Sequence, residues 1–357
     1  IDAKKEDKIN RFSLNKYSTE LRNEFKFVKD LNSMAVQSAA ERAWFAISRF
    51  YDNCKNKISG KKGFPRFQKD NRSTEYKTSG WKLHKTKRRI IFTDKKGIGT
   101  LRLLGKWDVH TYPVKTIKRV RLVRRADGYY CQFSIDVDNS KQLEATRNEV
   151  GLDVGLEYFY SDSNGNHLEN PRFLRKGEKN IKRSQRRIYK HKKDSSRRQK
   201  ARKIYARKHL KVSRQRIEFA KRVARALVQS NDLVAYEDLN VKNMVKNHCL
   251  AKSISDVAWR LFRQWLEYFS KKYCRQVIAV KPHYTSQICS NCGVKVKKSL
   301  SVRTHICQCG CNLQRDINAA INILERAREG HSRSNAQGVV TSTLLGANLV
   351  EQVTTMN

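Results

Sequence analysis

Five cysteines lie close together late in the chain, in the pattern C-x2-C-x14-C-x-C-x-C. They are Cys289, Cys292, Cys307, Cys309 and Cys311. Two such pairs are typical of a zinc ribbon, in which four thiolates bind Zn2+ with tetrahedral geometry. A closed site of this kind is structural, because a catalytic zinc keeps one position for water or substrate. The second pair is C-x-C where C-x2-C is usual, so Cys311 is an alternative to Cys309 as the fourth ligand.

Three acids stand in or beside apolar segments. Asp153 lies inside an apolar run, Glu237 ends another, and Asp316 opens an amphipathic segment. An acid in a buried strand costs several kcal/mol unless it is paired or binds a cation. Singly, each acid has an alternative role as an ion-pair partner, and Asp316 has one at a helix N-terminus. Together, they can bind two Mg2+ ions about 3.5–4 Å apart, which suits hydrolysis of a phosphodiester.

Polar neighbours of these residues can contact a nucleic-acid backbone. Arg315 stands beside Asp316 and can touch a scissile phosphate, while Ser286 and Gln287 precede the first cysteine pair. Solvated side chains and ordinary turn residues have the same pattern. These three residues therefore carry little weight by themselves.

Periodicity predicts the elements that position the acids and cysteines. Residues 150–160 are expected to form one buried strand, followed by a turn at 162–165 into a second strand. Residues 233–236 and 276–284 are expected to form further strands. Amphipathic helices are predicted at 255–273 and, after the cysteines, from Asp316 onward.

The N-terminal part has a different texture. Residues 32–55 have a helical period with Asn32 or Ser33 as the N-cap. Residues 81–138 alternate branched or aromatic residues with charged ones, and Asp127-Gly128 indicates a hairpin. The last hairpin is rich in Lys and Arg, which is weak evidence for a binding surface because solvated strands often have this composition.

The charge of the chain indicates a polyanionic partner. Its 357 residues, enough for two or three domains, include 76 Lys and Arg against 33 Asp and Glu, a formal net charge of +43. Nucleic acid is the first candidate and an anionic membrane the second. Residues 172–216 contain 21 of the basic residues and two acids, Glu178 and Asp194. Contact with phosphates is therefore favoured over a merely solvated helix pair.

Other features bear on location. No apolar run approaches the roughly 18 residues of a membrane-spanning helix, and no signal-peptide pattern opens the chain. The four cysteines outside the cluster occur singly, which agrees with a reducing compartment. A cytoplasmic protein is expected, and a preceding N-terminal segment is also expected because the chain starts at Ile1.

Several motifs, in this order, resemble the TnpB family, the RNA-guided nucleases encoded by insertion-sequence transposons. They are GLDVGL with Asp153, AYEDLNVKNM with Glu237, TSQICSNCG, and CQCGCNLQRDINAAINIL with Asp316. GFPRF at residues 63–67 and the tail sequence NAQGVVTSTLLGA also resemble stretches of TnpB proteins. The spacing between Cys309 and Asp316 is similar to the family's, which favours Cys309 as the fourth zinc ligand.

The resemblance implies a multidomain α+β fold: an N-terminal wedge β-barrel with a helical recognition insert, then a RuvC-like (RNase H fold) α/β nuclease domain with an inserted zinc ribbon. The expected division is 1–62 recognition helices, 63–148 wedge barrel, 149–285 RuvC-like domain with a basic helical insert at 172–230, 286–312 zinc ribbon for target nucleic acid, 313–330 last RuvC helix, and 331–357 a tail expected to be disordered in part.

The resemblance also implies the partners and the activity. A guide RNA transcribed from the transposon end pairs with double-stranded target DNA beside a short adjacent motif, and the RuvC site cuts the DNA with two Mg2+ ions at Asp153, Glu237 and Asp316. The zinc ion is structural. The protein is expected to be a monomer within its ribonucleoprotein, in a prokaryotic cytoplasm and on the nucleoid when bound to DNA.

Three alternatives share many of these features. A compact type V CRISPR effector has the same chemistry with a different source of guide. A guided DNA-binding regulator usually lacks one or more of the three acids, all of which this chain keeps. A transposase or a guide-independent nuclease can also carry a RuvC-like site.

Overall fold

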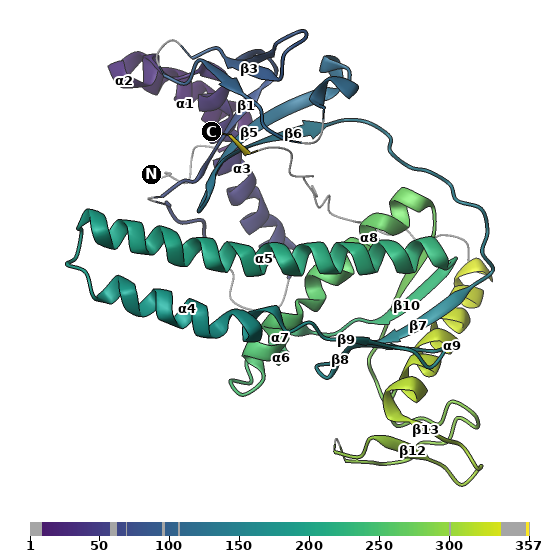
Figure 1. Cartoon of the computed structure of the whole chain (residues 1–357). Helices are drawn as coiled ribbons and strands as arrows, with labels where there is room; N and C mark the ends of the chain where they lie inside the picture. The colour runs from purple at the N-terminus through teal and green to yellow at the C-terminus, as the bar shows by residue number, and fades with distance from the viewer. Residues whose placement is uncertain are drawn as a thin grey trace. The chain divides into compact units, whose positions relative to one another are not determined.

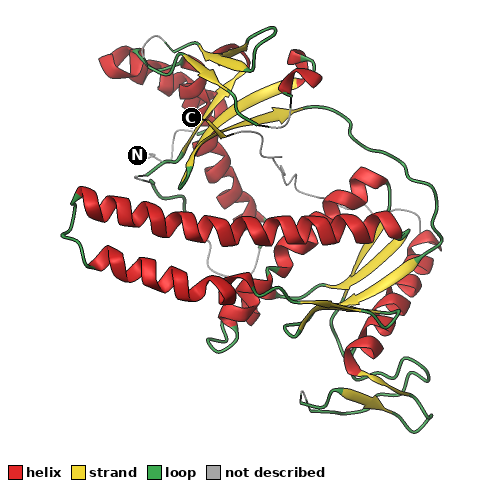
Figure 2. Ribbon diagram, in the orientation of Figure 1, coloured by secondary structure: helices red, strands yellow, loops and turns green. Residues whose placement is uncertain are grey.

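The computed structural model describes residues 9–57, 63–68, 70–94, 97–105, 108–299, 301–336 and 355–356. The chain divides into two compact units, residues 1–138 with 348–357 and residues 139–347 (Figure 1). Both contain helices and strands (Figure 2), so the protein has a multidomain mixed α/β fold. Within the described residues, no helix has both the length and the apolar character needed to cross a membrane.

The first unit combines helices with two antiparallel sheets. One sheet has the order β1-β5-β6-β14 and the other β2-β3-β4. The helices are α1 (Arg11–Glu24), α2 (Lys26–Lys29) and α3 (Ser33–Lys55), with short 3-10 helices at Thr78–Gly80, Val109–Thr111 and Val114–Thr116. The strands are β1 (Ser73–Lys77), β2 (Trp81–Leu83), β3 (Arg89–Phe92), β4 (Thr100–Arg102), β5 (Ile117–Arg125), β6 (Gly128–Ile135) and β14 (Thr355–Met356).

Side chains of both sheets share one apolar core. Tyr76 on β1 packs on Phe92 of β3 with ring centroids 4.6 Å apart, and Val120 on β5 is fully buried. The β5–β6 hairpin closes at the predicted turn, where Arg125 pairs with Gly128. Helix α3 begins after Asn32, whose side chain accepts the backbone N–H of Met34, as the capping prediction requires.

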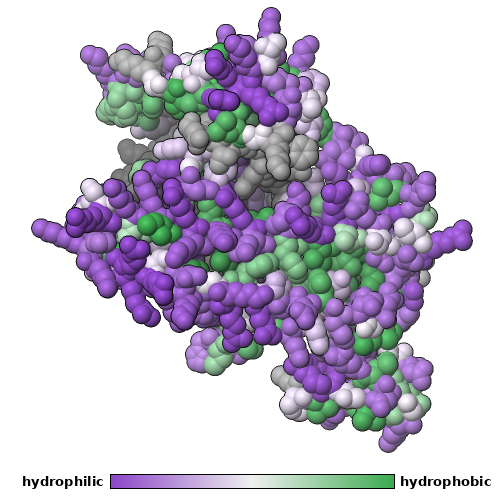
Figure 3. Space-filling model, viewed as in Figure 1, coloured by the Kyte–Doolittle hydropathy of each residue, from purple (hydrophilic) through white to green (hydrophobic). Residues whose placement is uncertain are grey.

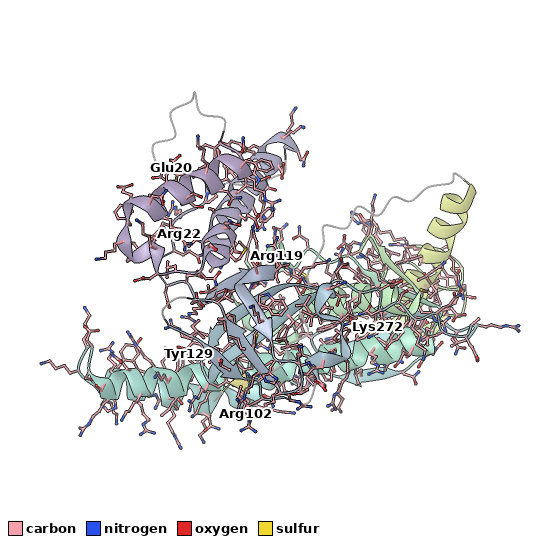
Figure 4. The ribbon with its side chains drawn as sticks, turned by 90° about the horizontal axis from the view of Figure 1, so that it is seen from above. Glu20, Arg22, Arg102, Arg119, Tyr129 and Lys272 are labelled. Carbon is pink, nitrogen blue, oxygen red and sulfur yellow. The ribbon has the colours of Figure 1, made fainter. Side chains whose placement is uncertain are left out.

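The opposite face of the β1–β5 pair buries charge. Glu75 on β1 is 4% exposed and accepts hydrogen bonds of 2.6 Å from both Arg119 and Arg121 on β5. Burial raises the pKa of Glu75, but these hydrogen bonds hold it below its ordinary value. Arg119, labelled in Figure 4, is therefore an ion-pair partner of a buried acid rather than a freely solvated side chain.

The second unit is built on a five-stranded sheet of order β11-β10-β7-β8-β9. Strands β7, β10 and β11 are parallel, whereas β8 and β9 continue from β7 as antiparallel neighbours. The strands are β7 (Glu149–Asp153), β8 (Tyr158–Asp162), β9 (His167–Glu169), β10 (Leu233–Glu237), β11 (Gln276–Val280), β12 (Thr304–Ile306) and β13 (Asn312–Gln314). The helices are α4 (Phe173–Tyr189), α5 (Ser196–Ser230), α6 (Val241–Met244), α7 (Ala251–Val257), α8 (Trp259–Tyr273) and α9 (Arg315–Ala336).

Helices cover both faces of this sheet. Ala235 of β10 packs with Ile323 and Leu324 of α9. Tyr236, whose side chain points to the other face, hydrogen-bonds Glu267 of α8 at 3.3 Å. On the α9 face, a Cβ atom at Gly151 would lie 2.0 Å from the carbonyl oxygen of Ala320, so only glycine permits this approach of strand and helix.

Helices α4 and α5 pack against each other as a long hairpin (Figure 1). Buried Ile181 and Ile188 on α4 and Val212 on α5 belong to the apolar face of the pair. On the face drawn in Figure 3, hydrophilic side chains cover most of both helices. The two helices occupy the segment predicted to be a basic helical insert, and Figure 4 shows long side chains projecting from it.

Some element predictions are wrong in detail. Residues 150–160 form two antiparallel strands, because the chain turns at residues 154–157 between β7 and β8. Gly155 lies in this turn, and apolar residues on both sides made the run look continuous. The turn at 162–165 therefore leads to a third strand, β9.

The predicted helix 255–273 is also interrupted. Ala258 adopts φ of 59°, which separates α7 from α8. Val257 and Trp259 are buried on either side, so the apolar pattern has no sign of the break. Strand β11 ends at Val280, shortly before Pro282, which lacks the N–H that a strand ladder needs.

The C-terminal helix and tail differ from their predicted limits. Helix α9 continues beyond the expected end at residue 330 to Ala336. Thr355 and Met356 pair with β6. Residues 337–354, which hold most of the predicted tail, lie outside the described residues.

Candidate active site and metal centre

Strand alternation brings two of the predicted acids to one place. Leu152 of β7 pairs with Tyr236 of β10, so Asp153 and Glu237 follow at the carboxyl ends of adjacent parallel strands. Successive side chains alternate between faces. Asp153 is therefore on the face of Gly151, and Glu237 is on the face of Ala235. Both of those residues contact α9 (Figure 1), whose first turn carries Asp316.

The electrostatics agree with this convergence. Burial raises the pKa of Asp153 well above its ordinary value, and repulsion from Glu237 and Asp316 raises it further, with partial relief from Arg315. A buried carboxyl group near two other acids favours protonation or a bound cation. Carboxylate oxygens are the ligands that Mg2+ prefers, so the donor set fits such ions.

The three carboxylates do not form one tight ligand cluster. In the part of the chain that the structure describes, only cysteine-containing groups bring three or more ligand atoms within 4.8 Å of one another. A two-metal site, whose ions lie about 3.5–4 Å apart, does not require all three carboxylates to meet at one point.

Two arginines approach Asp316. Arg315 Nε lies 3.2 Å from Asp316 Oδ1, and Arg303 Nη1 lies 3.8 Å from Asp316 Oδ2. Sequence reasoning identified Arg315 by its adjacency, and its role toward phosphate stays a prediction. The sequence did not indicate Arg303, because no motif or spacing relates Arg303 to Asp316.

Glu237 has a partner that the sequence pattern did not reveal. The Thr285 hydroxyl donates a hydrogen bond to Glu237 Oε1, and Thr285 is 5% exposed. Burial raises the pKa of Glu237, while the Thr285 hydrogen bond and the charge of Arg326 lower it in part. Ser286 and Gln287, which the sequence indicated as possible phosphate contacts, follow Thr285 in the turn that leads to the first cysteine pair. The Gln287 N–H donates a hydrogen bond to the Tyr284 carbonyl.

The cysteines form a four-sulfur cluster. The sulfur atoms of Cys289, Cys292, Cys307 and Cys309 all lie within 4.8 Å of one another. The Cys289–Cys309 and Cys292–Cys307 sulfur distances are both 3.6 Å. Cys311 instead falls in a separate group with Cys289 and buried His305. The geometry therefore fits a zinc ion bound by four thiolates, with Cys309 as the fourth ligand. The paired strands β12 and β13 flank the second cysteine pair.

Helix α9 holds the cysteine segment through two asparagines. Asn318, fully buried, accepts the Ser290 N–H at 3.0 Å and donates to the Ile288 carbonyl at 2.8 Å. Asn322 donates to the carbonyls of Thr285 at 2.8 Å and Ile288 at 2.7 Å. The same helix thus carries Asp316 and fixes the segment that bears Thr285 and Cys289.

Comparison with known proteins identifies the family. The fold and site are those of a multidomain α/β protein with three acids near one sheet edge and a four-cysteine cluster that could hold a metal ion. Residues 132–248 match a family described as "Probable transposase", and residues 259–323 match the family "Cas12f1-like, TNB domain". The chain belongs to the TnpB family, because it is 30% identical, over 84% of its length and 73% of the relative's, to the "Putative RNA-guided DNA endonuclease" of Streptomyces pristinaespiralis.

Two further matches agree. The "Putative RNA-guided DNA endonuclease InsQ" of Escherichia coli (strain K12) is 28% identical, over 84% of this chain and 76% of that protein. The fold is similar to a chain in the cryo-EM structure of a Cas12f1-sgRNA-target DNA complex, with a TM-score of 0.52 and 15% sequence identity. The alignment covers 88% of this chain and 76% of that one.

Proposed function

We propose that this protein is an RNA-guided DNA endonuclease that hydrolyses DNA at a RuvC-like site formed by Asp153, Glu237 and Asp316. The observation that carries the proposal is the convergence of two strand ends and one helix start, which raises the pKa of Asp153 by burial and by repulsion from the other two acids. Such an arrangement is unfavourable in an ordinary core and favourable around divalent cations.

The architecture supports this assignment. The antiparallel meander β7-β8-β9 continued by parallel β10 and β11 suits a RuvC-like domain of RNase H fold. The two sheets around one core in the first unit suit a wedge barrel with recognition helices α1 to α3. The cysteine centre lies between β11 and α9, as an inserted zinc ribbon should.

The chemistry divides between ions and side chains. Bound Mg2+ would supply positive charge to the phosphate and lower the pKa of a bound water. The three carboxylates would hold these ions. Thr285 fixes the orientation of Glu237, and Arg303 and Arg315 add positive charge near Asp316. In the hydrolysis, the bond between phosphorus and the leaving oxygen breaks, a bond between phosphorus and the water oxygen forms, and the water's protons pass to the leaving oxygen and to solvent.

The basic surface suits the partners. A guide RNA and its hybrid with DNA present many phosphates, while base pairing supplies sequence specificity. The α4–α5 hairpin provides the densest positive charge, with 21 Lys and Arg in residues 172–216. We further propose that the guide RNA derives from a transposon end, that the protein reads a short motif adjacent to the target, and that it acts as a monomer. A guide RNA from a CRISPR array is the alternative.

The test uses purified protein with its copurified RNA. We expect a discrete RNA species, cutting of matched DNA only with Mg2+, and loss of cutting with retained DNA binding in Asp153→Ala and Glu237→Ala. Cutting that survives either change, or that needs no RNA, would contradict the proposal. Ser134→Ala, an exposed change on β6 of the first unit, serves as the control.

A further inference from the structure

A cavity of about 500 Å3 lies in the second unit and includes part of the loop that follows Asp153. One wall is the loop after β7, with Leu156 and Glu157. A second wall is the start of α4, with Arg172 and Arg175, and a third is the segment from Cys249 to Asp256. This volume is within the usual range for sites that bind small molecules, roughly 300–1,000 Å3.

Hydrogen bonds hold the walls in place. Asn170 Nδ2 donates to the Leu156 carbonyl at 2.9 Å, which fixes the loop after β7. Asp256 is buried and accepts the Leu174 N–H at 2.9 Å and the Arg175 N–H at 3.3 Å, so it caps the start of α4 from α7. The cavity is therefore formed by fixed elements of the fold.

The charge of the cavity is positive. Its two acids are already neutralised, because Asp256 pairs with Arg216 at 2.8 Å and Glu157 with Arg303 at 3.2 Å. Among the described residues, no acid pairs with the guanidinium groups of Arg172 or Arg175, and both side chains are exposed. Two free guanidiniums at one wall suit a phosphate, which arginine binds through paired hydrogen bonds.

Ion pairs connect the cavity with the acids. Arg303 contacts Glu157 of the cavity wall at 3.2 Å and Asp316 at 3.8 Å. The loop that forms this wall also begins directly after Asp153. A ligand that lies in the cavity is thus a near neighbour of the site where a phosphodiester would be cut.

We propose that this cavity binds one nucleotide of the strand being cut, with its phosphate against Arg172 and Arg175 and its apolar parts against Leu156. The inference rests on the proposed nuclease function and adds a positioning site to it. Held there, the nucleotide fixes the next phosphodiester at the acids. A free nucleotide has the same chemistry, and the experiment distinguishes the two sources.

The experiment compares two double variants of the guide-loaded protein. The test variant is Arg172→Asn with Arg175→Ala; asparagine suits position 172 because its φ is 49°, where asparagine is tolerated. The control is Lys82→Ala with Lys115→Ala, which removes two exposed charges from the first unit, outside both the cavity and the basic α4–α5 hairpin. Equal melting temperatures show that both variants fold.

Single-turnover cleavage and target binding are measured for each. We expect the test variant to cut about 10- to 100-fold more slowly than wild type, as for loss of charge-assisted hydrogen bonds, with target affinity within about twofold. The control should cut at the wild-type rate. Unchanged cutting by the test variant, or equal slowing of both variants, would overturn the proposal.

A direct binding measurement separates this proposal from the nuclease function. Fluorescence anisotropy with a labelled five-nucleotide single-stranded DNA, on Asp153→Asn protein in Mg2+-free buffer, should show binding weakened about tenfold by the cavity changes and unaffected by the control. Binding of a labelled nucleoside monophosphate that the cavity changes abolish, with no binding of the oligonucleotide, would assign the cavity to a free nucleotide and overturn the proposal. A wild-type protein that never cuts DNA but shows the expected binding would reject the nuclease function alone.

Discussion

At the scale of single residues, Thr285 has the sharpest consequence for the candidate site. Its hydroxyl is the donor to the buried carboxylate of Glu237, and this hydrogen bond opposes the rise in the pKa of Glu237 that burial causes. A donor to the charged form stabilises that form. We therefore expect Thr285→Val to raise the pKa of Glu237 further, since valine keeps the shape of threonine and removes the donor.

The pH dependence of cleavage checks this. Glu237 must be ionised to hold a cation, so the acidic limb of the pH–rate profile should move to higher pH, by roughly one to two units for a charge-assisted hydrogen bond worth about 1.5–3 kcal/mol. The rates should approach wild type at the alkaline end. Thr285→Ser, which keeps the hydroxyl, should restore the original profile. A uniform loss of rate at every pH in Thr285→Val would show instead that the change is merely structural.

The acids were predictable from the sequence, and their supporting residues were not. An acid in an apolar strand is a visible anomaly, because burial of a charge needs a reason. Thr285 and Arg303 are ordinary residues in loops, and only the folded chain brings them to Glu237 and Asp316. The apolar cavity wall at Leu156 was likewise hidden, because it depends on a turn that the sequence pattern did not indicate.

At the scale of elements, α9 unites the two candidate sites. Asp316 is in its first turn, and Asn318 and Asn322 bind the backbone that leads to Cys289. Folding of the cysteine segment and placement of the acid are thus coupled through one helix. Metal at the cysteines should accordingly stabilise the surroundings of Asp316 and Thr285.

The fourth cysteine ligand can be tested within this segment. Cys309 is part of the four-sulfur cluster, whereas Cys311 groups with His305. We expect Cys309→Ser to lose most of its zinc and to melt several degrees lower, because structural zinc contributes directly to folding. Cys311→Ser is the matched control and should keep both its zinc and its melting temperature. Metal content by elemental analysis and thermal unfolding decide the matter, and the reverse result would assign the site to Cys311.

Element boundaries were less predictable than element types. The pattern found the apolar segments of β7, β10, β11 and α8, because burial sets the apolar period. It missed the turn at residues 154–157 and the break at Ala258, since buried residues continue on both sides of each. Local backbone conformation determines where the turn and the helix break lie, and the pattern of apolar residues carries no information about backbone conformation.

At the scale of the whole chain, the net charge of +43 is unevenly distributed. Ion pairs within the fold neutralise part of it, such as Arg119 and Arg121 on Glu75, and Arg216 on Asp256. The α4–α5 hairpin has few acids that can neutralise its positive charge, because Glu178 and Asp194 are the only acids in residues 172–216. The hairpin is therefore where we expect the strongest contact with phosphates.

The salt dependence of RNA binding tests this distribution. Each phosphate neutralised by a lysine or arginine contributes close to one unit to the slope of log affinity against log salt concentration. Replacement of exposed Lys192, Lys193 and Arg197 by alanine should therefore reduce the slope by about two to three units and weaken binding at low salt. The matched control replaces three exposed lysines of the first unit, Lys82, Lys85 and Lys115. An equal change in slope from both sets would show that binding is spread over the whole basic surface, and no change from the first set would remove the hairpin from the binding site.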